Sequence, residues 1–264
     1  MMPTEWQAFS SFRSAFKEKC HIWQDSCHNI LSPLQQKAYQ LDNVPPYPIE
    51  NSVVYNTDLD SVTPNSQIKL ILVGDNPGKN EQLNVNQKYL CGLAGKIAEN
   101  YFKKNPELVI DFRKNVIILN KTPVHTAKTK ELYSLVKYDT DVNNLINESQ
   151  VFMAEQTMTL QNALNIPIWL IGYGEIKTNG IFQSYLSTMT NLYTHKYMTN
   201  YDKLFVFQHF SMNRFSIDFN DFLNGKYDNV SQIKSRQLQN MTLLEQLQAL
   251  GTFHKEQIFK SRTI

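Results

Sequence analysis

The chain has 264 residues, is 42% hydrophobic and carries a formal charge of +2 at pH 7. A chain of this size can bury a full hydrophobic core. So small a net charge excludes a strongly basic protein whose whole surface attracts nucleic acid, and any basic surface must be local.

The first residues, MMPTEWQAFSSF, lack the basic segment and apolar segment of a secretory signal. No apolar run approaches the roughly 18 residues that a membrane span needs, so we expect no membrane partner. Cys20, Cys27 and Cys91 fit a reducing compartment. We therefore expect a cytoplasmic protein, and we take a monomer as the expected state. Cys20 and Cys27 do not predict a metal site, because seven helical residues rise about 10.5 Å.

Residues 4–30 place aromatic and cysteine side chains at steps of three and four, which predicts one long helix. The segment 42–67 is rich in proline and polar residues and predicts an extended connection. Four short apolar runs follow, at residues 68–73, 115–120, 166–172 and 203–208. None alternates with polar residues, so both faces of each strand are expected to be covered, as in a parallel sheet.

The segments between and after these strands favour helices, at residues 92–104, 141–165, 178–190, 216–223 and 231–259. Alternating strands and helices predict a three-layer α/β/α sandwich around a central four-stranded parallel sheet. We expect a single domain over residues 1–264. It would comprise an N-terminal helical segment (1–41), an α/β core (68–216) and C-terminal helices (217–264).

Polar residues follow three of the four strands. The first strand runs into residues 74–78, GDNPG; the second ends at Asn120; and the fourth is followed by QHFSMNRFS, which contains His209. Because parallel strands end at one edge of the sheet, these residues are expected to converge on one pocket. The stretch 74–80 is not a phosphate-binding Walker loop, because only three residues separate its glycines and Asn80 follows the lysine.

Three stretches resemble, in order and rough spacing, the motifs of the uracil-DNA glycosylase superfamily. They are LILVGDNPG (70–78), VIILNKTP (116–123) and VFQHFSMNRFS (206–216). The first is similar to the water-activating loop of the mismatch-specific and single-strand-selective branches. The second resembles the strand whose asparagine reads uracil, and the third resembles the loop that reaches the leaving base. YLCGLAGKIAENYF (89–102) is similar to a helix start of the iron–sulfur branches.

The resemblance implies a monofunctional DNA glycosylase that flips uracil or a 5-modified uracil out of DNA and hydrolyses its N-glycosidic bond in base excision repair. The implied catalytic residues are Asp75, Asn76 and His209, and either of the first two is a candidate to position the water. The implied substrate-binding residues are Gly74, Pro77, Gly78, Tyr89, Asn120 and Ser211. The implied DNA-binding residues are Lys79, Lys121, Met212, Asn213, Arg214 and Phe215, with Met212 or Phe215 as the wedge.

The chain departs from the superfamily pattern at several points. Phe210 replaces the proline after the histidine, and Leu90 stands where a stacking phenylalanine is expected, with Tyr89 as its substitute. Three cysteines cannot supply a four-cysteine iron–sulfur site, so no cofactor is expected. The sequence is also compatible with two alternatives: a catalytically inactive relative that binds nucleic acid or a protein, and an N-glycosidase for free nucleosides or nucleotides.

Overall fold

The computed structural model describes residues 1–177, 179–227 and 237–259, except the side chain of His28. Its centre is a parallel sheet of four strands, β1 (Leu70–Gly74), β2 (Val116–Asn120), β3 (Ile168–Ile171) and β4 (Leu204–Phe207). The strand order is β2-β1-β3-β4, and every residue of the four strands is buried. The predicted parallel sheet and three-layer architecture are confirmed.

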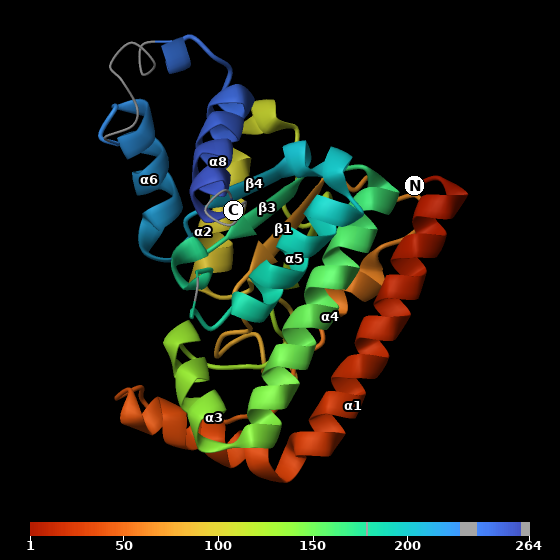
Figure 1. Ribbon diagram of the computed structural model, residues 1–264, viewed down its shortest axis with the longest axis vertical. Helices are drawn as coiled ribbons and strands as arrows, with labels where there is room; N and C mark the ends of the chain where they lie inside the picture. Colours follow the sequence, from red (N-terminus) through yellow and green to blue (C-terminus); the bar gives the residue numbers. More distant parts are fainter. Residues whose placement is uncertain (178, 228–236, 260–264) are drawn as a thin grey trace.

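Helices cover both faces of this sheet (Figure 1). On one face lie α4 (Thr140–Leu164) and α5 (Gln183–His195), and on the other lie α2 (Leu93–Lys104), α6 (Arg214–Leu223) and α8 (Leu243–Phe259). Two further α-helices in the described part of the chain are α1 (Pro3–Leu41) and the short α3 (Leu132–Tyr138).

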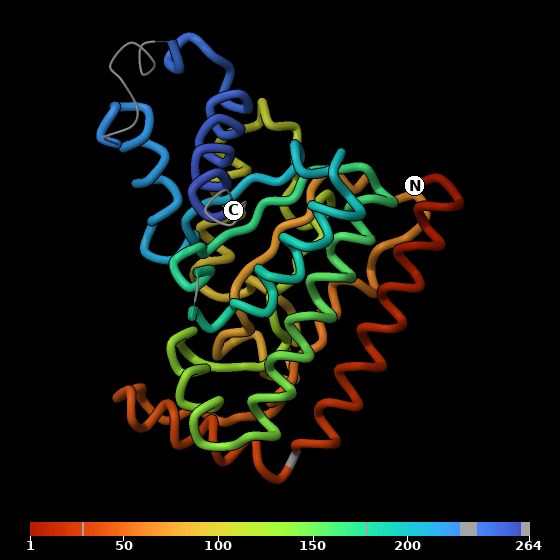
Figure 2. The backbone as a smooth tube through the Cα atoms, viewed as in Figure 1, coloured from red at the N-terminus to blue at the C-terminus, as the bar shows by residue number. Residues whose placement is uncertain are grey.

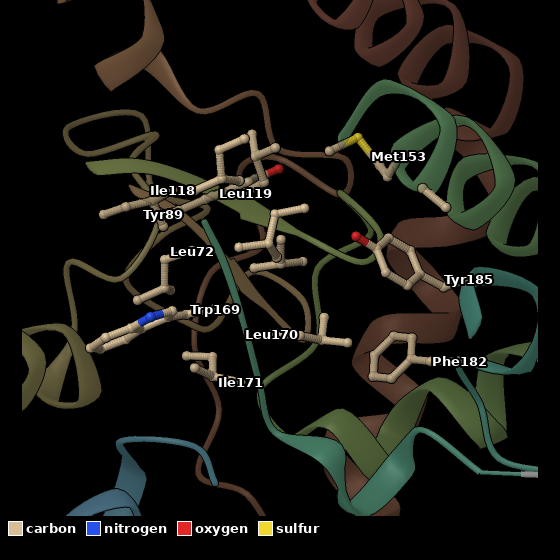
Figure 3. Close-up of a cluster of buried hydrophobic side chains, with 14 of the residues drawn as sticks. Leu72, Tyr89, Ile118, Leu119, Met153, Trp169, Leu170, Ile171, Phe182 and Tyr185 are labelled. Carbon is tan, nitrogen blue, oxygen red and sulfur yellow. The ribbon is translucent and has the colours of Figure 1, made fainter. Parts of the chain in front are cut away.

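The side chains of β3 show how the two faces are filled. Trp169 stacks on Phe102 of α2, with ring centroids 5.4 Å apart. The next residue, Leu170, points to the opposite side, toward Met153 of α4 and Tyr185 of α5 (Figure 3). Successive side chains of a strand face opposite ways, so an unbroken apolar run is what a sheet covered on both faces requires.

The first helix is longer than the sequence pattern predicted. It continues past residue 30, through Pro33, to Leu41. Its first part runs alongside α4, and its last part changes direction and lies by α3 (Figure 1 and Figure 2). Its apolar stripe also continues, since Leu31 and Ala38 are buried. The stripe therefore holds the helix onto the core on both sides of the proline.

Two other helices differ from their predicted ranges. α5 begins at Gln183 rather than at 178, after a turn that includes Gly180, and extends to His195. α8 begins at Leu243, and residues 231–236 of the predicted last helix lie outside the described residues. Among the described residues, no helix combines the length and apolar character needed to cross a membrane.

Candidate active site

A cavity of about 570 Å³ lies at the carboxyl ends of the strands. The chain passes from β1 to β2 on one side and then crosses to β3 on the other side of β1. Open α/β sheets bind ligands at such a reversal of the strand order. The predicted site residues in its wall are Asp75, Asn76, Gly78, Lys79, Asn120, His209, Ser211 and Met212. The ends of β1, β2 and β4 therefore meet at one pocket, as the strand-end pattern predicted.

His209 lies in this cavity with its Nδ1 held by the residue two positions on. Nδ1 is 3.1 Å from the backbone nitrogen of Ser211 and 2.9 Å from the Ser211 hydroxyl. A backbone N–H can only donate, so Nδ1 accepts and a neutral ring carries its proton on Nε2. Burial lowers the pKa of His209, and the Lys121 ammonium also lowers it, while Asp75 opposes both. The imidazole is therefore a neutral Nε2–H donor at neutral pH.

The residue after the histidine explains how the loop is held without the expected proline. Phe210 is fully buried and stacks on Phe215 with ring centroids 4.4 Å apart and an angle of 15° between the planes. The Phe215 backbone N–H donates to the His209 carbonyl at 3.1 Å. The loop is thus fixed by an aromatic stack and a closing hydrogen bond.

Asn120 is buried at the end of β2 and lines the cavity. Its amide nitrogen has no hydrogen-bond partner among the described residues. Buried amide nitrogens are nearly always paired, so this one is suited to bind a ligand. Gly74 is the residue opposite Asn120 in the sheet, and a Cβ there would lie 2.6 Å from Asn120 Oδ1. Gly74 is not part of the cavity wall; it gives the asparagine its space.

Asn76 is oriented by the segment that follows β2. Its Nδ2 donates to the Thr126 hydroxyl at 2.8 Å and lies 3.3 Å from the Val124 carbonyl. These contacts direct the amide nitrogen toward protein and leave the carbonyl oxygen as the group that Asn76 can offer to the cavity. Thr126 was not predicted, because nothing in its sequence context distinguishes it from an ordinary turn residue.

The Asp75 carboxylate is bound by two side chains and lies close to the backbone of a third residue. Its Oδ1 lies 2.6 Å from the ammonium of Lys121, and its Oδ2 accepts from the Thr129 hydroxyl at 3.3 Å. Gly172, at φ +78°, follows β3 beside it, and a Cβ there would lie 2.6 Å from Oδ1. Both carboxylate oxygens therefore already have partners.

The prediction that Lys121 contacts DNA phosphates is wrong. Its side chain is fully buried, and besides Asp75 it donates to the carbonyls of Gly74 at 3.2 Å and Ile171 at 2.7 Å. Burial lowers the pKa of this ammonium, and the Asp75 carboxylate opposes the shift. Three hydrogen bonds in the protein interior leave no route to a phosphate or to a sugar carbon.

The predicted roles of Tyr89 and Phe215 are also wrong. Tyr89 is fully buried and its hydroxyl donates to the Val54 carbonyl at 2.6 Å, so its ring cannot stack on a base. Phe215 belongs to the aromatic cluster and is 1% exposed, so it cannot wedge DNA. Leu90 lies in the cavity wall instead.

The Gly92–Gly95 stretch sets the position of Leu90. A Cβ on Gly95 would lie 1.4 Å from the Leu90 carbonyl oxygen, so only glycine lets α2 begin there. The same oxygen accepts from Arg113 Nη2 at 2.5 Å. Leu93, 75% exposed, lies in the cavity wall at the start of α2 and was not predicted.

The remaining predicted residues surround the cavity or lie beneath it. Met212 is 71% exposed at φ +53°, and Asn213 and Arg214 beside it are exposed but outside the cavity wall. The Lys79 ammonium lies 5.4 Å from the centre of the Tyr47 ring. Pro77 is buried below the loop.

Pro77 receives two hydrogen bonds from below. The Pro77 carbonyl is 2.8 Å from Nδ1 of the buried His125 and accepts from the Thr126 backbone N–H at 3.2 Å. The other ring nitrogen of His125, Nε2, is 2.9 Å from the Tyr47 hydroxyl. Burial lowers the pKa of His125 to about 4, so its neutral ring supports the Asn76–Pro77 turn. Pro77 therefore shapes the loop rather than contacting a ligand.

Within the described residues, no group of three or more histidine, cysteine, aspartate or glutamate side chains is placed to hold a metal ion. Comparisons with protein-family models, with curated proteins and with solved structures gave no match to this chain.

Proposed function

We propose that this protein is a DNA glycosylase that hydrolyses the N-glycosidic bond of uracil or a 5-modified uracil in DNA. The observation that supports the proposal is the convergence of Asn76, Asn120 and His209 on one cavity at the strand ends. Each of the three presents a different hydrogen-bonding group, and together they suit one flipped pyrimidine.

Asn120 is the proposed reader of the base. Its amide offers a donor and an acceptor side by side, which match O4 and the N3 proton of uracil. Cytosine presents the opposite pattern at these atoms, so the same amide orientation rejects it. The unpaired Nδ2 supports this role, because a bound O4 would satisfy it.

His209 is the proposed stabiliser of the leaving base. When the glycosidic bond breaks, negative charge collects on the uracil ring and its O2 oxygen. A neutral imidazole can donate its Nε2 proton as a hydrogen bond to that oxygen without a prior change in protonation state. A preorganised donor of this kind is worth about 3 kcal/mol in the transition state.

Asn76 is the proposed water-positioning residue. The developing sugar cation needs only a weak nucleophile, and the Asn76 carbonyl oxygen can accept a hydrogen bond from the attacking water. Asp75 is less suited to this task, since Lys121 and Thr129 already occupy its oxygens. We assign Asp75 an electrostatic role beside the sugar. With Lys121 buried, the residues of the motifs favour a monofunctional enzyme that leaves an abasic site.

DNA is the proposed partner. Met212 stands exposed at the cavity edge on the histidine-bearing loop, where an apolar side chain can fill the gap left by a flipped base. Lys79, which lies in the cavity wall, and Arg214, two residues after Met212, are exposed and are the candidates for phosphate contacts.

The test is incubation of the purified protein with single- and double-stranded oligonucleotides that contain one uracil, followed by alkali. We expect strand breaks at the uracil. His209→Ala should lower single-turnover cleavage at least about a hundredfold with little change in binding. His195→Ala, an exposed histidine at the end of α5, is the matched control and should cleave normally.

A second pair of variants assigns the water. Asn76→Ala should cost more activity than Asp75→Ala. The proposal is overturned by a wild-type protein that cleaves no uracil-containing DNA, and the assignment of His209 by a His209→Ala variant with the wild-type rate.

One observation favours the alternative of a binding protein without catalysis. Where a stacking aromatic ring is expected, the cavity wall has the aliphatic Leu90. Binding of uracil-containing DNA without strand breaks after alkali would support this alternative. Cleavage of free nucleosides but not of DNA would indicate the nucleoside hydrolase, for which an exposed Met212 has no use.

A further inference from the structure

Thr126 is a buried residue whose hydroxyl has a fixed hydrogen-bonding role on each side. It lies in the segment after β2, in the cavity wall, and is 2% exposed. The hydroxyl donates its only proton to the Lys128 carbonyl at 3.0 Å. Its oxygen can therefore only accept from the Asn76 amide nitrogen, which lies 2.8 Å away.

The other contacts of the Asn76 amide nitrogen are with acceptors as well. The carbonyls of Pro77 and Val124 lie 3.3 Å from it, and the Thr126 carbonyl lies 3.5 Å from it. The Thr126 hydroxyl is closer than any of these three. The oxygen and nitrogen of an amide have almost the same shape, so hydrogen bonds decide which way the group faces. All four contacts require the same orientation of Asn76.

The segment that carries Thr126 is fastened to the loop after β1 at two further points. The Thr126 backbone N–H donates to the Pro77 carbonyl at 3.2 Å, and the Thr129 hydroxyl donates to Asp75 Oδ2 at 3.3 Å. The two stretches therefore hold each other in register, and the threonine hydroxyl faces the asparagine without a further rearrangement.

The outer side of the same segment is braced by the end of α1. The Lys128 ammonium lies 2.6 Å from a carboxylate oxygen of Asp42, the residue after the helix. The lysine side chain is about half exposed, and an ion pair of this kind contributes little. The buried hydroxyl of Thr126 is therefore the contact on which the orientation of Asn76 chiefly depends.

This orientation matters for the water that attacks the sugar. The water oxygen must use a lone pair to form its bond to the sugar carbon, while the base leaves with the electrons of the glycosidic bond and gains the proton that the water loses. The Asn76 carbonyl oxygen accepts a hydrogen bond from the water and leaves that lone pair free. An amide turned the other way would donate to the lone pair and hold the water unreactive.

We propose that Thr126 is a positioning residue for the attack by water, because its hydroxyl turns the Asn76 amide so that the carbonyl oxygen serves the cavity. This inference rests on the proposed function, and it names the residue that makes Asn76 an acceptor. In this role Thr126 acts through Asn76 and not on the reacting atoms.

The test measures single-turnover cleavage of a single-stranded oligonucleotide that contains one uracil. Thr126→Val keeps the shape of the side chain and removes the hydroxyl. The rate constant should fall about tenfold, as for the loss of one buried hydrogen bond, and the DNA concentration that gives half the maximal rate should change little. Thr126→Ser keeps a hydroxyl and should restore most of the rate.

Thr157→Val is the matched control. Thr157 is also buried, lies on α4 outside the cavity wall, and accepts a hydrogen bond from the Tyr185 hydroxyl at 3.4 Å. Each valine variant loses one buried hydroxyl, so denaturant unfolding should show comparable losses of stability. Only Thr126→Val should lose activity.

A double-mutant cycle with Asn76→Ala separates positioning from a purely structural role. If Thr126 acts through Asn76, its hydroxyl has no effect once the amide is gone. The double variant Asn76→Ala/Thr126→Val should then cleave at the same rate as Asn76→Ala alone. A hydroxyl that only stabilises the segment would instead lower the rate by the same factor in both backgrounds.

A wild-type rate constant in Thr126→Val would overturn the inference, and so would a further tenfold loss in the Asn76→Ala background. Either result would leave uracil cleavage by the wild-type protein, and with it the proposed function, intact. A wild-type protein that cleaves no uracil-containing DNA would overturn the proposed function and this inference together.

Discussion

The Lys121 ammonium and the Asp75 carboxylate lie 2.6 Å apart beneath the site, with the lysine fully buried. The same ammonium binds the carbonyls of Gly74 and Ile171, so one side chain from the residue after β2 joins the ends of β1 and β3. A buried charge is tolerated only when it is paired and hydrogen-bonded. The pair therefore fixes the strand ends on which the cavity is built.

The ion pair depends on the absence of a side chain at Gly172. Gly172→Ala should destabilise the protein by about 1–3 kcal/mol from backbone strain alone, since φ is +78°. It should also displace Asp75, because the new Cβ would lie 2.6 Å from Oδ1. Denaturant unfolding measures the loss. Gly174→Ala is the control, since its Cβ would meet nothing within 4 Å; equal effects of the two variants would contradict the steric explanation.

Met212 is expected to act only on duplex DNA. Met212→Ala should lower cleavage of paired uracil about tenfold or more and leave cleavage of single-stranded uracil nearly unchanged, because only the duplex must be unstacked. Rates on matched single- and double-stranded oligonucleotides measure the difference. Met198→Ala removes an equally exposed methionine outside the cavity wall and should change neither rate. Equal losses on both substrates would assign Met212 to some other role.

Gly78→Tyr should close the cavity toward the 5-carbon. The ring would fill the open space beside Gly78 in the cavity wall, so activity on 5-substituted uracils should fall far more than activity on uracil. We expect the wild-type protein to cleave 5-hydroxymethyluracil at a rate within roughly tenfold of its rate on uracil. This ratio corresponds to a difference of about 1.4 kcal/mol in activation free energy. A wild-type protein that cleaves uracil but no 5-substituted base would mean that another side chain already closes this space.

Burial raises the pKa of Glu81, a carboxyl group in the cavity wall, and this predicts a pH-dependent stability that does not depend on function. Its folded-state pKa, about 7, exceeds the usual 4.5, so the folded state binds more protons between these values. The associated stability is fully present below pH 4.5 and is lost as pH rises through 7. Relative to that of Glu81→Gln, the free energy of unfolding of the wild-type protein should rise by about 3 kcal/mol as the pH is lowered from 8 to 4.5. Denaturant unfolding of both proteins across this range measures the difference.

Because it is a difference between two proteins, this measurement cancels the titration of His125. The folded pKa of that residue is about 4, below its usual 6.5, so its contribution has the opposite sign and is lost as pH falls from about 6.5 to 4. A wild-type-minus-variant difference that stays constant with pH would mean that Glu81 is ionised normally.

The sheet and the convergence of the strand ends could be predicted because they depend on local patterns. Uninterrupted apolar runs require cover on both faces, and parallel strands end at one edge. Asp75, Asn76, Asn120 and His209 were therefore located from the sequence. The start of α5 at Gln183 could not be located, because the turn before it contains no strong helix breaker other than Gly180.

The sequence did not predict the roles of individual residues where contacts distant in the chain determine them. A lysine after a strand is ordinarily solvated, and the burial of Lys121 follows from carbonyls on β1 and β3 that its own neighbours do not reveal. Tyr89 and Leu90 are adjacent, but the positive φ of Leu90 and the tight approach of Gly95 turn the leucine, not the tyrosine, to the cavity. Glu81 and Thr126 have no sequence signal at all.

The aromatic stack of Phe210 on Phe215 has a consequence for how the site meets its ligand. The His209 loop is fastened to the core by two buried rings and closed by the hydrogen bond from Phe215 to His209. Its conformational entropy is therefore lost when the chain folds, before any ligand arrives. Binding then has to order the ligand but not the loop, which is the advantage of a preorganised surface.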